Sequence, residues 1–285
     1  MVTKKKYELS NKTIEIDGKI LHQIKALKDF SDVKAGDLGG WIEKEDNLSQ
    51  MGNAWAGGNA KVYGDAKICD NAKVFGNALV CGSAVVRDNA KVYGYAFVHD
   101  NALICMDAVV LGEVFGNAEV CGNARVHGYA RIFGNAEVYC NAEVYGDAEV
   151  YDNAKVFGNA QVYGYARIYC NAEVYGDAKV YDNAIVSDNA HVFGNAKVCC
   201  GAWVCGNAMV CGDVSVRCGA DYIIFKNFWS SGRFFTWTRS NNMWKVGCFY
   251  GTGEELIEKA YKDSAKSGKE YEKIVRYVDS ILADK

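Results

Sequence analysis

The sequence lacks a surplus of basic residues. Its 285 residues include 32 Lys and Arg against 35 Asp and Glu, which gives a formal net charge of -3 at pH 7. Proteins that bind nucleic acid usually present clustered positive charge to the phosphate backbone. We therefore expect no nucleic-acid partner.

Long apolar runs are also missing. Basic residues occur near the start of the chain, but no apolar stretch of signal-peptide length follows them. No segment reaches the roughly 18 apolar residues that a membrane span requires. We therefore expect a soluble, cytoplasmic protein without a membrane partner.

What the sequence does contain is a six-residue repeat. An alanine recurs every six residues from Ala54 through Ala108 and again from Ala118 through Ala208. Alanine, a charged residue, valine and an aromatic residue alternate with the period of a β-strand, and Gly-Asn, Asp-Asn or Gly-Asp then supplies a sharp corner. Each unit is thus a short strand plus a turn, and units with identical inward faces predict a parallel β-helix.

Charges at a spacing of 18 residues predict three units per coil. Outward side chains one coil apart lie on adjacent strands, where opposite signs are favourable. A spacing of 18 gives mainly opposite pairs, whereas a spacing of 12 mixes opposite and like pairs almost evenly. The opposite pairs at 18 are Arg125 with Glu143, Arg131 with Glu149, Glu137 with Lys155, Glu149 with Arg167 and Lys155 with Glu173. About nine coils, at roughly 4.8 Å each, make a rod on the order of 45 Å long.

One unit, within residues 110–118, lacks two residues of the period near Gly112. This irregularity is either a tolerated deletion or a local bend or binding notch. With the short unit counted as one, Cys105 and Cys121 fall on the same edge one coil apart, where a disulfide is geometrically feasible. Because cytosolic proteins keep their thiols reduced, we expect no bond there.

The twelve cysteines show no CxxC pair, and the adjacent Cys199 and Cys200 are a weak metal signal on their own. Many cysteines occupy the repeat position that elsewhere holds an aromatic residue. We therefore expect reduced packing residues, no metal site and no cofactor. The cysteines at this position are Cys69, Cys81, Cys105, Cys121, Cys199, Cys205 and Cys211.

The hexad, with valine leading, Asn or Asp before Ala, and no proline, resembles that of hexapeptide-repeat acyltransferases. Residues 32–42, which end in Gly39-Gly40-Trp41-Ile42, and residues 47–50 resemble the entry segment of YdcK-type bacterial proteins. The resemblance implies a left-handed β-helix, trimeric assembly and an acyltransferase-like ancestry. Similar rods with this entry segment also occur in phage and prophage genomes.

The chain divides into a cap at residues 1–52, a β-helix at 53–217 and a C-terminal α+β domain at 218–285. Caps are expected because a solenoid exposes unpaired strand edges at both ends. In the C-terminal domain we predict strands at residues 221–225, 233–239 and 244–249. Thr252 with Glu255 forms a capping box before two amphipathic helices, the second at residues 269–282. The predicted fold class is therefore mainly β.

Two groups of residues are candidate partner contacts. Leu79, Phe97 and Leu103 make the outward position apolar near the start of the rod, where either cap packing or an oligomer or partner interface would bury them. Tryptophan and arginine dominate interaction hot spots, and the C-terminal domain concentrates both; the alternative is that these residues form its own core. The second group is Arg233, Trp237, Arg239 and Trp244.

Catalytic candidates are few. The chain has four histidines, and His99 with Cys81 one coil away is the only nucleophile-like pair that the repeat offers. A general base needs a cleft that positions it, and no inserted loop supplies one. We therefore favour a non-catalytic binding or scaffold protein with an unidentified protein partner, for example a phage-encoded antagonist of a host factor. The alternatives are an acyl-coenzyme A-dependent acyltransferase and a self-assembling structural protein that stacks end to end into filaments. The chain could also form a homo-oligomer, a trimer or a dimer.

Overall fold

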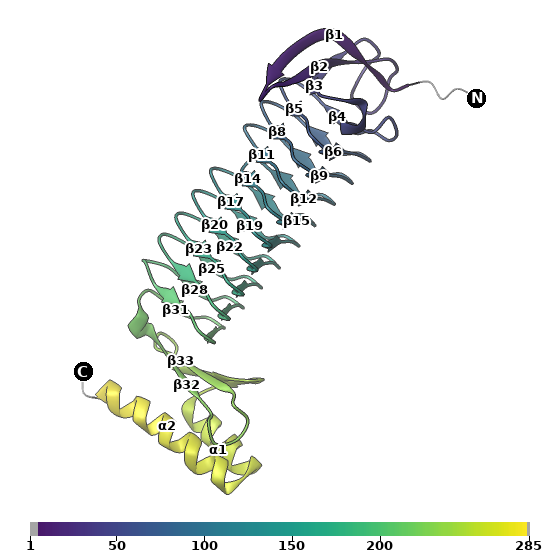
Figure 1. Cartoon of the computed structure of the whole chain (residues 1–285). Coiled ribbons are helices and arrows are strands. Elements are labelled where there is room, and N and C mark those ends of the chain that lie inside the picture. The colour runs from purple at the N-terminus through teal and green to yellow at the C-terminus, as the bar shows by residue number, and fades with distance from the viewer. Residues whose placement is uncertain (1–4, 284–285) are drawn as a thin grey trace.

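The computed structural model describes residues 5–283, which form a rod of stacked coils with a cap at one end and a small α+β domain at the other (Figure 1). The rod confirms the predicted parallel β-solenoid and its mainly β class. None of the helices among the described residues is long and apolar enough to span a membrane.

Two-residue strands from β4 to β31 build three parallel faces. The first face continues the cap sheet through β5 (Lys61–Val62), β8 (Leu79–Val80), β11 (Phe97–Val98), β14 (Glu113–Val114), β17 (Arg131–Ile132), β20 (Glu149–Val150), β23 (Arg167–Ile168), β26 (Ile185–Val186) and β29 (Trp203–Val204). The second face is β4 (Trp55–Ala56), β7 (Lys73–Val74), β10 (Lys91–Val92), β13 (Val109–Val110), β16 (Arg125–Val126), β19 (Glu143–Val144), β22 (Gln161–Val162), β25 (Lys179–Val180), β28 (Lys197–Val198) and β31 (Ser215–Val216). The third face is β6 (Lys67–Ile68), β9 (Val85–Val86), β12 (Leu103–Ile104), β15 (Glu119–Val120), β18 (Glu137–Val138), β21 (Lys155–Val156), β24 (Glu173–Val174), β27 (His191–Val192) and β30 (Met209–Val210).

The strand register confirms three units per coil. Arg125 pairs with Glu143, Arg131 with Glu149, and Lys155 with Glu173, as the spacing of 18 requires. The ten strands of the second face match the predicted number of coils closely. The left-handed winding implied by the resemblance stays a prediction.

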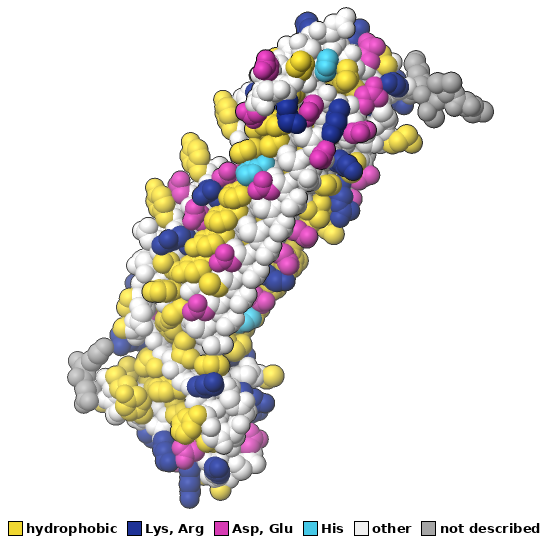
Figure 2. Space-filling view, viewed as in Figure 1, with side chains coloured by type: hydrophobic (Ala, Val, Ile, Leu, Met, Phe, Trp, Pro, Cys, Tyr) yellow, Lys and Arg dark blue, Asp and Glu magenta, His cyan; other side chains and the backbone are white. Residues whose placement is uncertain are grey.

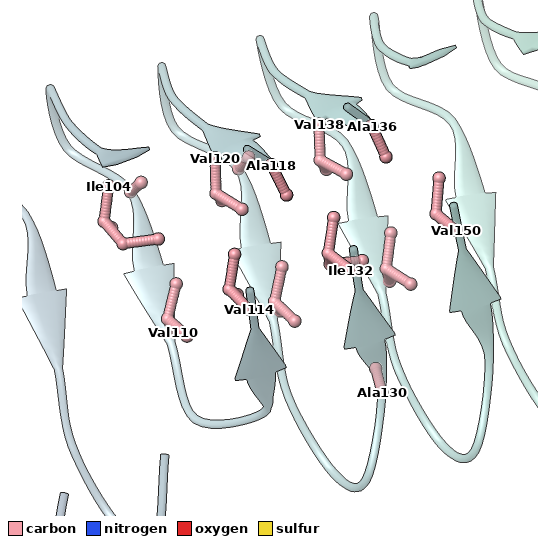
Figure 3. Close-up of a cluster of buried hydrophobic side chains, with 14 of the residues drawn as sticks. Ile104, Val110, Val114, Ala118, Val120, Ala130, Ile132, Ala136, Val138 and Val150 are labelled. Carbon is pink, nitrogen blue, oxygen red and sulfur yellow. The ribbon is translucent and has the colours of Figure 1, made fainter. Parts of the chain in front are cut away.

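Valine and alanine fill the interior of the rod. Val120, Val138, Ala118 and Ala136 are fully buried, and Figure 3 shows such side chains stacked from coil to coil. Burying a valine side chain contributes about 1.5 kcal/mol or more, and every coil repeats that contribution. Because each coil contacts only its neighbours, the stability of the rod accumulates along its length.

The N-terminal cap extends the first face. Strands β1 (Tyr7–Ile16) and β2 (Lys19–Ala26) form a hairpin, and β3 (Leu38–Ile42) pairs with both β2 and β5. A 3-10 turn, η1 (Glu45–Asn47), follows. The sequence pattern predicts strands around residues 13–16 and 20–24 and then a turn-rich segment that ends at Trp41. The structure makes the end of that segment a strand, β3, which joins the first coil.

The C-terminal domain places two helices on a four-stranded antiparallel sheet. The sheet follows η2 (Gly219–Asp221) and contains β32 (Tyr222–Lys226), β33 (Phe234–Thr238), β34 (Met243–Val246) and β35 (Phe249–Gly251). Helices α1 (Gly253–Asp263) and α2 (Ala265–Ala283) follow, and α1 begins with the predicted Thr252–Glu255 capping box. The sequence predicts three of the four strands; β35 is too short to show an alternating pattern.

The C-terminal domain covers the free edge of the last coil. The Tyr222 hydroxyl donates to the Trp203 carbonyl at 2.9 Å and accepts from the Cys205 amide at 3.3 Å. The Met209 amide donates to Thr236 Oγ1 at 2.8 Å. These contacts satisfy backbone groups that an exposed strand edge would leave open to pairing with another chain.

Candidate functional site

Asparagine ladders line two of the three edges of the rod. On the edge from the first to the third face, five asparagines each donate to the next at 3.0–3.3 Å, and the last bond ends on Asn189; the donors are Asn101, Asn117, Asn135, Asn153 and Asn171. On the edge from the third to the second face, similar bonds include Asn123 to Asn141 and Asn141 to Asn159, both at 3.0 Å. These corner side chains therefore have a structural role. Figure 2 shows a lengthwise white row, neither charged nor hydrophobic, beside lengthwise rows of hydrophobic side chains.

The third edge, from the second to the first face, differs. Its ladder consists of Asn59 to Asn77, at 3.2 Å, and tyrosine then takes the same corner position at Tyr95, Tyr129 and Tyr165. These side chains are 83%, 81% and 63% exposed. We call this the tyrosine edge. Successive tyrosines stand two coils apart, which is about 10 Å at the usual strand spacing.

The short unit falls on the tyrosine edge. Only Leu111 and Gly112 join β13 to β14, whereas four residues form each neighbouring corner, and Figure 3 shows this connection as shallower than those of the next coils. The flanking strands keep their register, since Val109 pairs with Arg125 and Glu113 pairs with Arg131. The two missing residues therefore come out of the corner alone and leave the coil undistorted.

The shortened corner leaves a notch between Tyr95 and Tyr129. Its volume is about 620 Å³, and Phe97, Leu111, Glu113 and Arg131 line it along with Gly94, Gly112 and Gly128. Gly112 lies so close to the coil below that a Cβ atom there would stand 2.5 Å from the Ala130 carbonyl oxygen. The short unit thus forms a local notch without a bend or disruption of the pairing, and a tolerated deletion stays the alternative to a binding notch.

A charge ladder forms the polar wall of the notch. Arg131 Nε donates to Glu113 at 2.7 Å and its Nη1 donates to Glu149 at 3.2 Å. The guanidinium also lies 5.3 Å from the ring centroids of Phe115 and Phe133. The hydrogen bond with Glu113 raises the pKa of Arg131 above its ordinary value. The notch thus combines an apolar floor with a fixed ion pair.

His99 lies near the notch but is enclosed. Its ring stacks between Phe97 and Phe115, at centroid distances of 4.1 and 4.8 Å. Nδ1 is 3.4 Å from Asp100, and Nε2 is 3.5 Å from Glu113, too long for a regular hydrogen bond. Because Nε2 is buried, a substrate has no direct access to it in this arrangement.

Cys81, the other catalytic candidate, is buried beneath the N-terminal hairpin with Leu21 and Tyr63. Burial raises the pKa of its thiol. An activated cysteine nucleophile needs the opposite shift, because the thiolate is the reactive species. The environments of His99 and Cys81 are those of packing residues.

The predicted partner contacts of the C-terminal domain lie partly in its core and partly at its surface. Trp237 and Trp244, at 1% and 2% exposure, lie in the core of the C-terminal domain, the alternative stated for them. Arg233 lines a surface pocket with Lys259 and Asp263, and Arg239 is half-buried.

The three apolar residues predicted as contacts near the start of the rod also lie in different places. Leu79 and Phe97 pack against the hairpin cap, and Phe97 also reaches the notch. Leu103 lines a shallow pocket beside Cys105 and Cys121. Those two cysteines form a disulfide, with 4.8 Å between their Cα atoms, so the expectation that they stay reduced is wrong in this structure. They are 16 residues apart because the coil between them contains the short unit.

The tyrosine edge was missed because its signal depends on the coil count. Tyrosine replaces asparagine at Tyr95, Tyr129 and Tyr165, and these positions are separated by 34 and 36 residues. They fall on one edge only when the short unit is counted as a full one. That count would have found the edge from the sequence.

No family model matches the chain. Over 36 residues, which is 13% of this chain, it is 56% identical to "Uncharacterized acetyltransferase YdcK" of Escherichia coli (strain K12). The matched stretch spans 11% of the length of that protein. The solenoid of six-residue units and this short stretch of identity fit a hexapeptide-repeat protein of the YdcK type.

Proposed function

We propose that the protein is a non-catalytic binding rod, and that the notch between Tyr95 and Tyr129 receives an apolar side chain of a protein partner. The observation that carries this proposal is the shortened corner between the exposed Tyr95 and Tyr129. The notch occurs where two further corner residues would otherwise fill the row.

The composition of the notch suits a protein contact. Tyrosine and arginine are enriched in interaction hot spots, and an anchor side chain in a desolvated pocket typically dominates binding. Phe97 and Leu111 supply an apolar floor, while Tyr95 and Tyr129 can close around the anchor. The Arg131–Glu113 pair offers a charged group of each sign at the wall.

Catalysis receives less support from the same region. His99 is stacked between two phenylalanine rings with Nε2 buried, and Cys81 is buried elsewhere. A general base must come within hydrogen-bond reach of its substrate. His99 would have to leave both rings before it could act.

The test compares proteins captured from a host-cell lysate by the full chain and by variants. One variant restores the two missing residues after Gly112 as Asn-Ala, which fills the notch, and a second combines Tyr95→Ser with Tyr129→Ser. Tyr165→Ser is the matched control, since it removes an exposed tyrosine away from the notch. We expect a partner that is lost from both notch variants and retained by the control. Equal capture by all variants would refute the proposal.

The C-terminal domain adds a second contact surface to this proposal. Arg233 and Arg239 remain candidates there, whereas their tryptophan neighbours hold the domain together. Antagonism of a host factor by a phage-encoded rod is one role that such a protein would fill. Alanine at both arginines should then weaken capture without unfolding the domain.

An acyltransferase is the second candidate, favoured by the name of the E. coli protein that shares the short match. Its expected signs are a dimer or trimer in light scattering and retention of acetyl-coenzyme A by that oligomer. A particle that does not bind the coenzyme would remove this candidate and leave the binding rod.

A further inference from the structure

Three potential metal ligands meet at one corner of the tyrosine edge. Cys199 and Cys200 follow strand β28, and Asp182 occupies the corner one coil before Cys200. One donor atom from each residue lies within 4.8 Å of the others. The carboxylate adds a third donor, which the adjacent cysteines lack in the sequence alone.

We propose that Asp182, Cys199 and Cys200 bind a thiophilic divalent cation such as Zn²⁺. The two sulfur atoms are 3.4 Å apart, and Cys200 Sγ is 3.9 Å from Asp182 Oδ2. A tetrahedral zinc ion with usual bond lengths needs roughly 3.8 Å between two sulfurs and roughly 3.5 Å between sulfur and oxygen. These two distances therefore require adjustments of about half an ångström, and the Asp182 carboxylate lies within 4.8 Å of Cys199 Sγ.

The backbone of the corner fixes these donors. Asp182 and Cys200 both adopt the left-handed conformation, with φ of 57° and 58°, so their side chains project from equivalent positions on adjacent coils. Cys199 is buried against the rod, while Cys200 and Asp182 are exposed. A Cβ atom at the following Gly201 would contact nothing within 4 Å, so the corner is open to an incoming ion.

The ligand set selects the class of metal. Thiolates favour zinc, cadmium and copper(I) over magnesium or calcium, which prefer oxygen. Cys218 follows Cys200 by one coil length but is not among the donors within 4.8 Å of one another, so solvent completes the coordination. Both cysteines bind the ion as thiolates, so binding releases their protons.

The chain contains a matched control site. Cys170 also occupies a left-handed corner, with φ of 59°, and its amide donates to Asp152 of the preceding coil at 3.2 Å. Its preceding residue is Tyr169, where the proposed site has Cys199. Cys170→Ser therefore removes a corner cysteine beside an aspartate without touching a thiol pair.

The experiment titrates reduced, metal-free full-length protein with Co²⁺ and then displaces it with Zn²⁺. We expect one equivalent of Co²⁺ per chain, with a thiolate-to-metal charge-transfer band that zinc abolishes. Cys200→Ser should weaken binding at least about tenfold. Asp182→Asn should also weaken it, and Cys170→Ser should bind like the parent chain.

Cys200→Ser is the decisive variant because the Cys200 side chain is exposed and its loss should leave the rod folded, which circular dichroism can verify. Folded Cys200→Ser that keeps the charge-transfer band and affinity of the parent chain would overturn the site. So would a parent chain that binds Co²⁺ without that band.

Discussion

At the scale of single residues, the corners explain most of the composition. The four-residue corners need a residue at positive φ, which Gly146 supplies at 72° and Asp152 at 58°. Glycine takes this conformation without steric cost, and aspartate and asparagine tolerate it better than other side chains. Cys140, Cys170 and Cys200 take the same position. Their left-handed backbone conformation carries a small strain, which the packing of the rod must offset.

Gly112 is predicted to be the least replaceable glycine of the notch. Gly112→Ala should destabilise the protein by about 1–3 kcal/mol, because the added carbon meets a backbone oxygen at 2.5 Å. Gly94→Ala should cost about 1 kcal/mol through its φ of 71°, since only the Leu111 side chain is near. Thermal unfolding of both variants checks this order. Gly219→Ala is the control, with open space around it, and an equal loss there would contradict the explanation.

Lys6 predicts a rise in stability at alkaline pH. Its ammonium is buried and donates to the Ala54 carbonyl at 2.8 Å, and burial, with Lys28 nearby, lowers its pKa to about 8. Between about pH 8 and 10.5 the unfolded state binds more protons than the folded state, so stability increases with pH, by up to about 3 kcal/mol. Lys6→Met should abolish that increase, as measured by thermal unfolding across this range. An unchanged pH profile would contradict the buried charge.

At the scale of elements, the disulfide makes a countable prediction. Ten of the twelve cysteines are free in the structure, and Cys105 and Cys121 are bonded. The unfolded, unreduced protein should therefore titrate ten thiols, rising to twelve after reduction. Protein with Cys105→Ser and Cys121→Ser should give ten under both conditions. Twelve thiols without reduction would show that the pair is not bonded.

A column of stacked rings predicts loss of stability above pH 10. Tyr145, Tyr163 and Tyr181 stack at 4.8 and 5.0 Å, and burial raises the pKa of Tyr145 and Tyr163. A hydrogen bond to Cys199 and burial raise that of Tyr181 to about 12.

The stability that these protonated rings provide is complete below pH 10. It is lost as pH rises toward the folded pKa values, because the unfolded state releases its protons first. Alkaline titration followed by phenolate absorbance should show late, cooperative ionisation. Tyr163→Phe should keep the stack and reduce the loss; identical alkaline unfolding in this variant would argue against the column.

Elements that follow a local period were predictable, and those that depend on packing were not. The 18-residue register follows from opposite charges such as Arg131 and Glu149, which lie side by side only if each coil contains three units. Trp41 gave no strand signal because β3 exists through its pairing with β2 and β5. His99 gave no sign of its enclosure, since its partner Phe115 adjoins it only through the shortened coil.

At the scale of the whole molecule, both ends of the rod are closed. Lys6 and Asn47 donate to carbonyl groups of the first coil, and Tyr222, Thr236 and Ser240 bond to the last coils. Strand edges covered in this way do not template the addition of further chains.

We therefore expect discrete particles instead of filaments. Light scattering over a range of protein concentrations should give a constant mass, whether that mass is of a single chain, a dimer or a trimer. Growth of the mass with concentration, or fibres in electron micrographs, would restore the self-assembling alternative.

The short unit also sets a rule for how such a chain can change in length. A loss of 18 residues removes one complete coil and keeps the C-terminal domain in the same angular position, whereas a loss of six turns it by about a third of a revolution about the rod. The two-residue loss at Gly112 does neither, because the register resumes at Glu113. A corner can therefore lose residues without changing the length of the rod or the angular position of the coils that follow. Recognition at an edge and spacing between the ends can thus vary independently.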